Sequence, residues 1–234
     1  MKVAALGDIH APKYFDLFKK SLEEFLKRKE GVSAFLLAGD LIDGGRYDQL
    51  DIIRELIRKV DLPTYSCFGN NEYQEYSDIV MKKLPEVVFL DDNCMKLKRI
   101  EDDVAIVGSR GVLDKPTYWQ KKNWNDADEI YEKRRNKLNE LADMCQADMK
   151  ILLIHYPPTL KIVKGENPRF TEQMGSNKLD PVIKKFNLVI TAHAHKGKKL
   201  VEIDGIPVYN VSLPLNGGIR ILEVKQKHGL EKYM

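Results

Sequence analysis

The sequence has little cysteine and no long apolar run. Its three cysteines, Cys67, Cys94 and Cys145, form an odd set without Cys-x-x-Cys spacing, which argues against a disulfide framework or a zinc-binding cysteine motif. The N-terminus also lacks a charged leader followed by an apolar segment, so we expect a location in the reducing cytoplasm. No apolar stretch approaches the roughly 18 to 20 residues of a membrane span, and we expect no integral membrane role.

An excess of charge of one sign is also absent. The 38 basic and 35 acidic residues give a formal net charge of +3, so no global basic field indicates binding to nucleic acid. The sequence contains no internal repeat, no low-complexity tract and no segment that resembles a linker. We therefore expect one domain over residues 1–234. The oligomeric state is not indicated.

Short apolar runs alternate with amphipathic segments through the first part of the chain. The runs fit strands that are buried on both faces, and the segments between them place apolar residues on one face at helical spacing. This alternation predicts a β-α-β-α arrangement in which helices connect neighbouring strands. Strands are expected over residues 2–6, 34–37 and 64–68, and helices around the apolar positions of 18–26, 53–60 and 79–84.

Shorter apolar runs follow from residue 87, and brief polar turns join them, which indicates a change to antiparallel strands. Asp204 and Gly205 form a turn dipeptide that predicts a hairpin. Residues 158–178 show no clear periodicity, and loops of that length inside compact domains are often functional. The strands expected here are 87–90, 95–100, 104–107, 151–154, 188–191, 200–203, 206–211 and 219–224.

Residues 113–146 interrupt this pattern and predict a cap inserted into the domain. The segment begins with aromatic and basic residues and continues as a helix, for which Asn125 is the expected N-cap. Trp119 and Trp124 could stack on a base of the substrate while neighbouring lysines attract phosphate. Alternatively, the tryptophans dock the cap onto the domain and the lysines stay solvated.

Polar residues with metal-binding chemistry recur just past the ends of the expected strands. Seen alone, Asp40 after the run FLLAG would be a helix cap, and one histidine at a strand end is usually an ordinary hydrogen-bonded residue. The coincidence of so many such residues indicates a metal centre instead. The candidate ligands are Asp8, His10, Asp40, Asn70, His155, His193 and His195.

These ligands offer oxygen and nitrogen donors and no thiolate. Such a set suits Mn, Fe or Zn in an open coordination sphere more than a closed structural zinc site. Asp8 and His10 lie two residues apart, as do His193 and His195. That spacing lets both side chains of a pair point the same way where the backbone is extended.

The motifs GDIH, GDLID, GNNE and AHAH, with the segment around His155, stand in the order found in the calcineurin-like metallophosphoesterases. The resemblance extends from Asp8 to His195. It implies an α/β (α+β) fold, namely a four-layer αββα sandwich of two mixed sheets flanked by helices, with a two-metal site at the strand ends. One metal would be held by Asp8, His10 and His195 and the other by Asn70, His155 and His193, with Asp40 as the bridge.

The resemblance also implies the reaction. Two divalent metal ions, with Mn²⁺ as the first candidate and Fe, Ni or Zn as alternatives, would share a bridging hydroxide that attacks phosphorus. Their net positive charge would favour the anionic phosphate in the transition state. The expected substrate is a phosphate ester, and a nucleotide-like ester fits this description.

Two positions depart from the family pattern. Where the family often has histidine after Gly-Asn, this chain has Asn71, and Ala192 replaces the glycine before the final histidine pair. The family histidine is thought to stabilise the transition state or protonate the leaving group, and an amide cannot donate a proton in that way. A positioned general acid contributes about 10²- to 10⁴-fold. Members that lack this histidine often resemble phosphodiesterases, so the resemblance implies phosphodiesters rather than monoesters as substrates, with Asp40, Asn70 and Asn71 as catalytic positions.

Two further residues have open roles. Arg110 in GSRG could contact a phosphate oxygen or remain a solvated loop residue. Glu72 could orient the site from behind the ligands, or it could begin a helix from Tyr73. A rival interpretation of the whole chain is a scaffold that keeps this fold but binds partner proteins, with weak catalysis or none.

Overall fold

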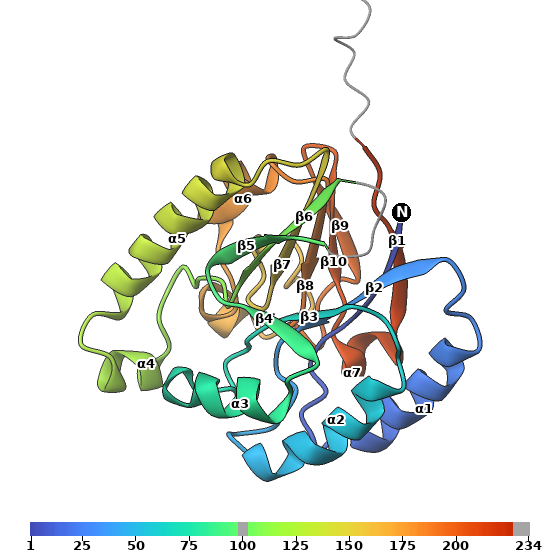
Figure 1. Cartoon of the computed structure of the whole chain (residues 1–234). Coiled ribbons are helices and arrows are strands. Elements are labelled where there is room, and N and C mark those ends of the chain that lie inside the picture. Colours follow the sequence, from blue (N-terminus) through green and yellow to red (C-terminus); the bar gives the residue numbers. More distant parts are fainter. Residues whose placement is uncertain (98–102, 227–234) are drawn as a thin grey trace, which may run out of the picture.

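Two β-sheets pack face to face between two layers of helices in the computed structural model, which describes residues 1–97 and 103–226 (Figure 1). The strand order is β11-β1-β2-β3-β4 in the first sheet and β5-β6-β7-β8-β10-β9 in the second. Both sheets mix parallel and antiparallel pairs. The expected four-layer αββα sandwich is therefore confirmed.

The first sheet is parallel except at one edge. The pairs β1–β2, β2–β3 and β3–β4 are parallel, and β11 pairs antiparallel with β1. Because the strands β1 to β3 run the same way, their carboxyl ends meet at one edge, which is where open α/β sheets usually bind ligands. The strands are β1 (Lys2–Leu6), β2 (Val32–Ala38), β3 (Thr64–Cys67), β4 (Val87–Leu90) and β11 (Arg220–Glu223).

The second sheet has a parallel centre and antiparallel edges. The strands β6, β7, β8 and β10 pair in parallel, whereas β5 and β9 pair antiparallel with β6 and β10. The change to antiparallel pairing, predicted for the strands between residues 87 and 107, is confirmed for the pair β5–β6 and wrong for β4, which pairs in parallel with β3. The strands are β5 (Asn93–Lys96), β6 (Val104–Ser109), β7 (Met149–Ile154), β8 (Leu188–Thr191), β9 (Leu200–Ile203) and β10 (Ile206–Asn210).

The expected strand boundaries agree with the structure to within about two residues where it describes them. The strand expected over 95–100 begins earlier, at Asn93, and its residues 98–100 lie outside the described part. The predicted hairpin is confirmed, since β9 and β10 pair antiparallel. Its turn residues Asp204 and Gly205 have φ of 49° and 78°, the left-handed conformation that such a tight turn requires.

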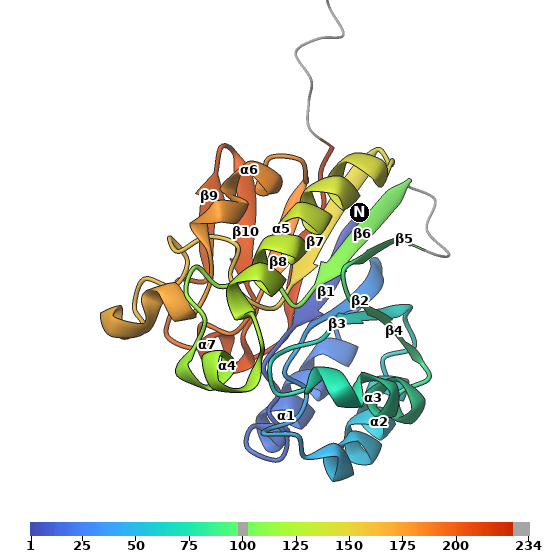
Figure 2. The same cartoon turned by 90° about the vertical axis from the view of Figure 1, so that its left-hand side faces the viewer.

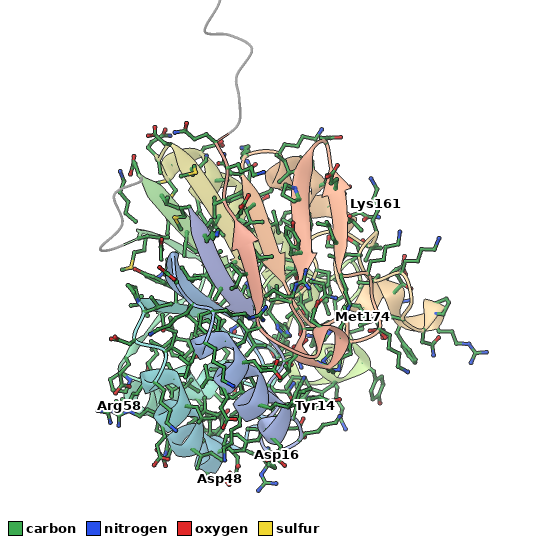
Figure 3. The ribbon with its side chains drawn as sticks, turned by 90° about the vertical axis from the view of Figure 1, so that its right-hand side faces the viewer. Tyr14, Asp16, Asp48, Arg58, Lys161 and Met174 are labelled. Carbon is green, nitrogen blue, oxygen red and sulfur yellow. A yellow bond between two sulfur atoms is a disulfide. The ribbon has the colours of Figure 1, made fainter. Side chains whose placement is uncertain are left out.

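Helices α1 to α3 cover the outer face of the first sheet, and α5 lies across the outer face of the second (Figure 2). Figure 3 labels Asp16, Asp48 and Arg58 on the first of these layers, and Lys161 and Met174 on the long loop between β7 and α6. The helices are α1 (Phe15–Leu26), α2 (Leu50–Arg58), α3 (Ser77–Lys83), α4 (Tyr118–Asn123), α5 (Ala127–Met144), α6 (Asp180–Ile183) and α7 (Leu213–Asn216).

Small side chains let the two sheets approach closely at their centre. Ala5, Ala34 and Ala38 are fully buried in the cluster between the sheets. Gly7 continues this pattern past β1, because a Cβ at this position would lie 2.6 Å from the Cβ of Ala192 in the opposite sheet. The alanine that replaces the family glycine is therefore accommodated by the missing side chain at residue 7.

Two helices occupy the segment 113–146. The helix α4 was not predicted, although Thr117 and Gln120 form a reciprocal capping box at its start, a pattern that is visible in the sequence. The N-cap of α5 is Asp126, whose side chain accepts a hydrogen bond from Glu129 N. The prediction of Asn125 was wrong by one residue. That the segment is an insertion stays a prediction, as does a single domain over the whole chain.

The cysteines differ from expectation. Cys94 on β5 and Cys145 after α5 form a disulfide with Cα atoms 6.3 Å apart, while Cys67 is buried and free. Disulfides are rare in reducing compartments, so this pairing does not favour the cytoplasm, and that location stays a prediction. Within the described ranges, none of the helices has the length and apolar character to cross a membrane.

Candidate metal centre

The structure brings all seven predicted ligands together where the carboxyl ends of strands from both sheets meet. Each follows its strand within four residues, because the chain must turn there and the backbone no longer continues the ladder. Asp8 and His10 follow β1, Asp40 follows β2, Asn70 follows β3, His155 follows β7, and His193 and His195 follow β8.

Four of these ligands have a left-handed backbone conformation, which residues other than glycine rarely adopt. The φ angles are 59° at Asp8, 43° at His10, 51° at Asp40 and 68° at His193. Such conformations cost on the order of 1–3 kcal/mol each and persist where the surrounding structure holds them, which is common at functional sites. Here Asp8 N donates to Gly39 O and His10 N donates to Asp40 O, both at 3.0 Å. These two hydrogen bonds fix the backbone of the loop after β1 against that of the loop after β2.

Asp8, His10 and His195 form one group of converging donors. The Nε2 atom of His195 lies 3.3 Å from Asp8 Oδ2 and 3.3 Å from His10 Nε2. Suitable ligand atoms of all three residues lie within 4.8 Å of one another. This spacing fits a single metal ion coordinated by one carboxylate and two imidazoles.

Asp40, His155 and His193 form a second group that meets the same limit of 4.8 Å. The Nδ1 atom of His155 lies 2.9 Å from Ala38 O, a contact that fixes the proton on Nδ1 and leaves Nε2 free as a ligand. That Nε2 lies 3.0 Å from the side-chain oxygen of Asn70. Asn70 thus completes the second group on its solvent side, where its own side chain is exposed.

Asp40 lies between the two groups. Its Oδ2 is 3.6 Å from His10 Nε2 and 3.5 Å from His155 Nε2, which belong to different groups. Asn71 fixes this carboxylate, because its backbone N–H donates to Oδ1 at 2.8 Å and its amide Nδ2 donates to Oδ2 at 2.6 Å. A carboxylate in this position could contact an ion held by either group.

Burial makes the charges of this centre strongly interdependent. Burial and the negative charge of Asp8 raise the pKa of Asp40 to about 6. Burial would also raise the pKa of Asp8, but the hydrogen bond from His195 and the other nearby histidines outweigh it and lower that pKa. Burial and the neighbouring His155 lower the pKa of His193 to about 3. His193 is therefore neutral near pH 7, which is the form that binds metals.

The donor set fits two divalent cations. Asp8 Oδ1 is buried and accepts no hydrogen bond, which is costly for a carboxylate oxygen unless a cation lies beside it. The donors are carboxylate, amide and imidazole groups, which suit Mn, Fe, Ni or Zn. The residues of both groups would hold the ions, and Asp40 would contact both.

The comparison with known families agrees with this geometry. The family model of the calcineurin-like phosphoesterases matches residues 1–197. The chain belongs to this family. Its members typically bind two divalent metal ions, in agreement with the two groups of donors. A search of curated proteins found no match.

Solved structures superpose on most of this member of the family at low sequence identity. GAP50, the anchor in the inner membrane complex of Plasmodium, is 16% identical with a TM-score of 0.61 over 92% of this chain and 72% of its own. The NAD nucleotidase of Haemophilus influenzae is 15% identical with a TM-score of 0.52, over 91% of this chain and 44% of its own. The 5'-nucleotidase precursor of Thermus thermophilus is 14% identical with a TM-score of 0.52, over 91% of this chain and 48% of its own. At these identities the likeness shows the fold alone.

Glu72 ties together two of the loops that carry ligands. Its buried carboxylate accepts hydrogen bonds from four backbone N–H groups, those of Gly69, Asp40, Leu41 and Ile42, at 2.6–3.2 Å. Burial and the nearby Asp40 raise the pKa of Glu72 to about 7, although these donors oppose the rise. Glu72 does not itself begin a helix: a 3-10 helix follows at Gln74–Tyr76, with Tyr73 as its N-cap, and leads into α3 at Ser77. The expectation that it orients the site agrees with its contacts.

Two residues beside the ligands were missed. Asp43 Oδ1 lies 3.3 Å from His10 Nδ1, although the two atoms do not meet hydrogen-bond geometry. The signal was present, since Asp43 is the second aspartate of GDLID. Tyr14, labelled in Figure 3, meets the rings of His10 and His195 edge-on, with centroids 6.2 and 6.3 Å away. Nothing in the sequence pattern distinguished Tyr14 from other tyrosines.

Arg110 is buried and fully engaged with protein atoms. Its guanidinium donates to Gly69 O, Glu72 O and Ser77 Oγ at 2.6–2.9 Å and pairs with Asp91 at 3.2 Å. It is not the solvated loop residue that was one alternative. Arg110 thus supports the loop that carries Asn70 and Asn71, and its contact with phosphate stays a prediction.

The two tryptophans of the segment 113–146 differ in their surroundings. Trp124 packs edge-on against Tyr131 of α5, with ring centroids 5.9 Å apart, and lies partly buried against the apolar cluster between α5 and the second sheet. Its contact with a substrate stays a prediction. Trp119 is 55% exposed and faces Tyr73. The neighbouring Lys121 and Lys122 are exposed.

We expect the substitution Gly69→Ala to weaken metal binding. An added Cβ would collide with the carboxylate of Asp40 and with its backbone nitrogen, so the bridging ligand must move. Displacing groups that orient ligands typically lowers metal affinity by about 10- to 100-fold. Isothermal titration with Mn²⁺ measures the change, and Gly218→Ala is the control because its added Cβ would have only Ser21 near it, at 3.6 Å. Equal affinities for both variants would contradict the assigned position of Asp40.

Proposed function

We propose that this chain hydrolyses phosphate esters, phosphodiesters in preference to monoesters, with two divalent cations bound, of which Mn²⁺ is our first candidate. The observation that supports this most is the position of Asp40 between two separate groups of metal ligands. Bound cations would supply the positive charge that activates water and neutralises phosphate oxygens. Asn70, exposed beside His155, leaves the second group open to a substrate.

The preference for diesters rests on Asn71. Its side-chain amide donates to Asp40 Oδ2 at 2.6 Å, and its oxygen accepts from Gly44 N at 2.9 Å. Both ends of the amide are therefore engaged, and it holds the bridging carboxylate instead of donating a proton to the substrate. A leaving group that receives no proton must be stable as an anion, so the rate should depend strongly on its acidity.

A panel of esters assayed with Mn, Ni, Fe and Zn tests the proposal. The panel includes bis-4-nitrophenyl phosphate, 4-nitrophenyl phosphate, alkyl phosphodiesters and cyclic nucleotides. We expect metal-dependent turnover that is fastest on diesters with acidic leaving groups. Equal rates on aryl and alkyl diesters would contradict the role given to Asn71, and faster turnover of monoesters would contradict the diester preference.

A second candidate function is a scaffold that binds partner proteins. It is favoured by the absence of the family histidine at position 71 and by the fold shared with GAP50, which is an anchor in its own complex. The complete set of metal ligands favours the enzyme instead. Binding of two metal ions without turnover of any ester in the panel would support the scaffold.

The substitution Asn71→His should raise the activity on alkyl phosphodiesters. A histidine can donate a proton to a poorly stabilised leaving group, and a positioned general acid contributes about 10²- to 10⁴-fold. We expect a gain at the lower end of that range, because the introduced imidazole would keep only part of the contact to Asp40. The ratio of kcat/KM on alkyl to that on aryl esters is the measurement. Asn71→Ala is the control, and a ratio that rises equally in both variants would contradict the account.

A further inference from the structure

A cavity of about 330 Å³ lies beside the metal centre, between α4 and the loop 69–75. Asn70 and His193 line it at one end, and both also belong to the second group of metal ligands. A phosphate ester at the centre would therefore have room for one of its substituents in this cavity. In Figure 2, α4 lies at the same end of the second sheet as the loops that follow its parallel strands.

Two aromatic side chains face each other at this cavity. The rings of Tyr73 and Trp119 are nearly parallel, with an interplanar angle of 18° and centroids 6.5 Å apart, and both residues line the cavity. They come from separate segments, the loop after β3 and the helix α4. Trp119 is 55% exposed, so much of its ring can still be covered. Burying an exposed tryptophan against a planar ligand is favourable through both stacking and loss of hydrated apolar surface.

The cationic groups that line the cavity are already paired. Arg110 forms an ion pair with Asp91 and donates hydrogen bonds to the carbonyl groups of Gly69 and Glu72. Arg134 forms an ion pair with Asp92 at 2.8 Å. Among the described lining residues no other lysine or arginine is present. The cavity therefore offers polar and aromatic surface without free positive charge, which disfavours an additional phosphate or another anionic substituent.

We propose that this cavity binds the substituent of the substrate that is not phosphate, and that the substituent is an uncharged planar aromatic group stacked against Trp119 and Tyr73. A nucleoside and a simple aryl group share this chemistry. The proposal rests on the proposed function for its place in the reaction. Binding of the aromatic group itself needs neither metal nor turnover.

Equilibrium dialysis of the full chain with labelled adenosine, phenol and ribose tests the proposal directly. We expect adenosine or phenol to bind and ribose to bind at least tenfold more weakly, because only the first two have a planar aromatic ring. Trp119→Ala should weaken the binding of the aromatic probes by about 5- to 100-fold, the range found for stacking of one base on an aromatic side chain. Trp119→Phe should retain most of it.

Tyr118→Ala is the matched control, because Tyr118 is the neighbouring aromatic residue, is 81% exposed and does not line the cavity. It should leave all affinities unchanged. Circular dichroism of each variant verifies folding. Equal binding of ribose and adenosine, or unchanged affinity in Trp119→Ala, would overturn the proposal.

Kinetics separate this proposal from the proposed function. If esters are hydrolysed, Trp119→Ala should raise KM for nucleoside and aryl diesters and leave unchanged the KM for bis(2,2,2-trifluoroethyl) phosphate, a diester without an aromatic ring whose leaving group is more acidic than a simple alcohol. Equal changes in KM for all esters would overturn the assignment of the cavity. If no ester is hydrolysed while Trp119-dependent binding of adenosine or phenol is found, the proposed function fails and the aromatic site stands.

Discussion

The buried carboxylate of Asp40 is the constraint on which the functional edge of this protein depends. Burying a carboxylate is costly unless hydrogen bonds or cations compensate for the lost water. Asp40 receives two hydrogen bonds from Asn71, and histidines of both sheets approach its other side. Asp8 brings a second buried carboxylate nearby. Two divalent cations would more than offset both negative charges, and the two groups of donors are the candidate sites for them.

A second layer of contacts keeps the ligand loops in place. Glu72 binds the backbone N–H groups of the loops after β2 and β3, and Arg110 binds carbonyl groups of the loop after β3. Arg110 also comes from the second sheet, since it follows β6. The contacts therefore connect the two sheets next to the metal ligands. These contacts help to hold the left-handed backbone of Asp40, and the hydrogen bonds from Asp8 N to Gly39 O and from His10 N to Asp40 O tie the loop after β1 to it.

Much of the fold and of the metal site could be predicted from the sequence, because apolar runs identify buried strands and several of these runs are followed by metal-type ligands. What depends on tertiary packing could not. The pairing of Cys94 with Cys145 joins elements that are 51 residues apart, and no local pattern indicates it. The buried role of Arg110 needs the loops of both sheets, and the facing rings of Tyr73 and Trp119 come from separate segments. The helix α4 is different, since its capping box was readable from residues 117–120.

The metal content of three proteins tests the central claim that Asp40 is shared by two metal sites. The wild-type chain, Asp8→Asn and Asp40→Asn would be dialysed against the same concentration of Mn²⁺, the lowest that saturates the wild type, and their metal content would be measured by mass spectrometry. If Asp40 bridges the two sites, the wild type should hold two ions per chain and Asp8→Asn close to one. Asp40→Asn should hold nearly none, because loss of the shared carboxylate weakens both sites together. One firmly bound ion in Asp40→Asn, or fewer than two ions in the saturated wild type, would contradict the account.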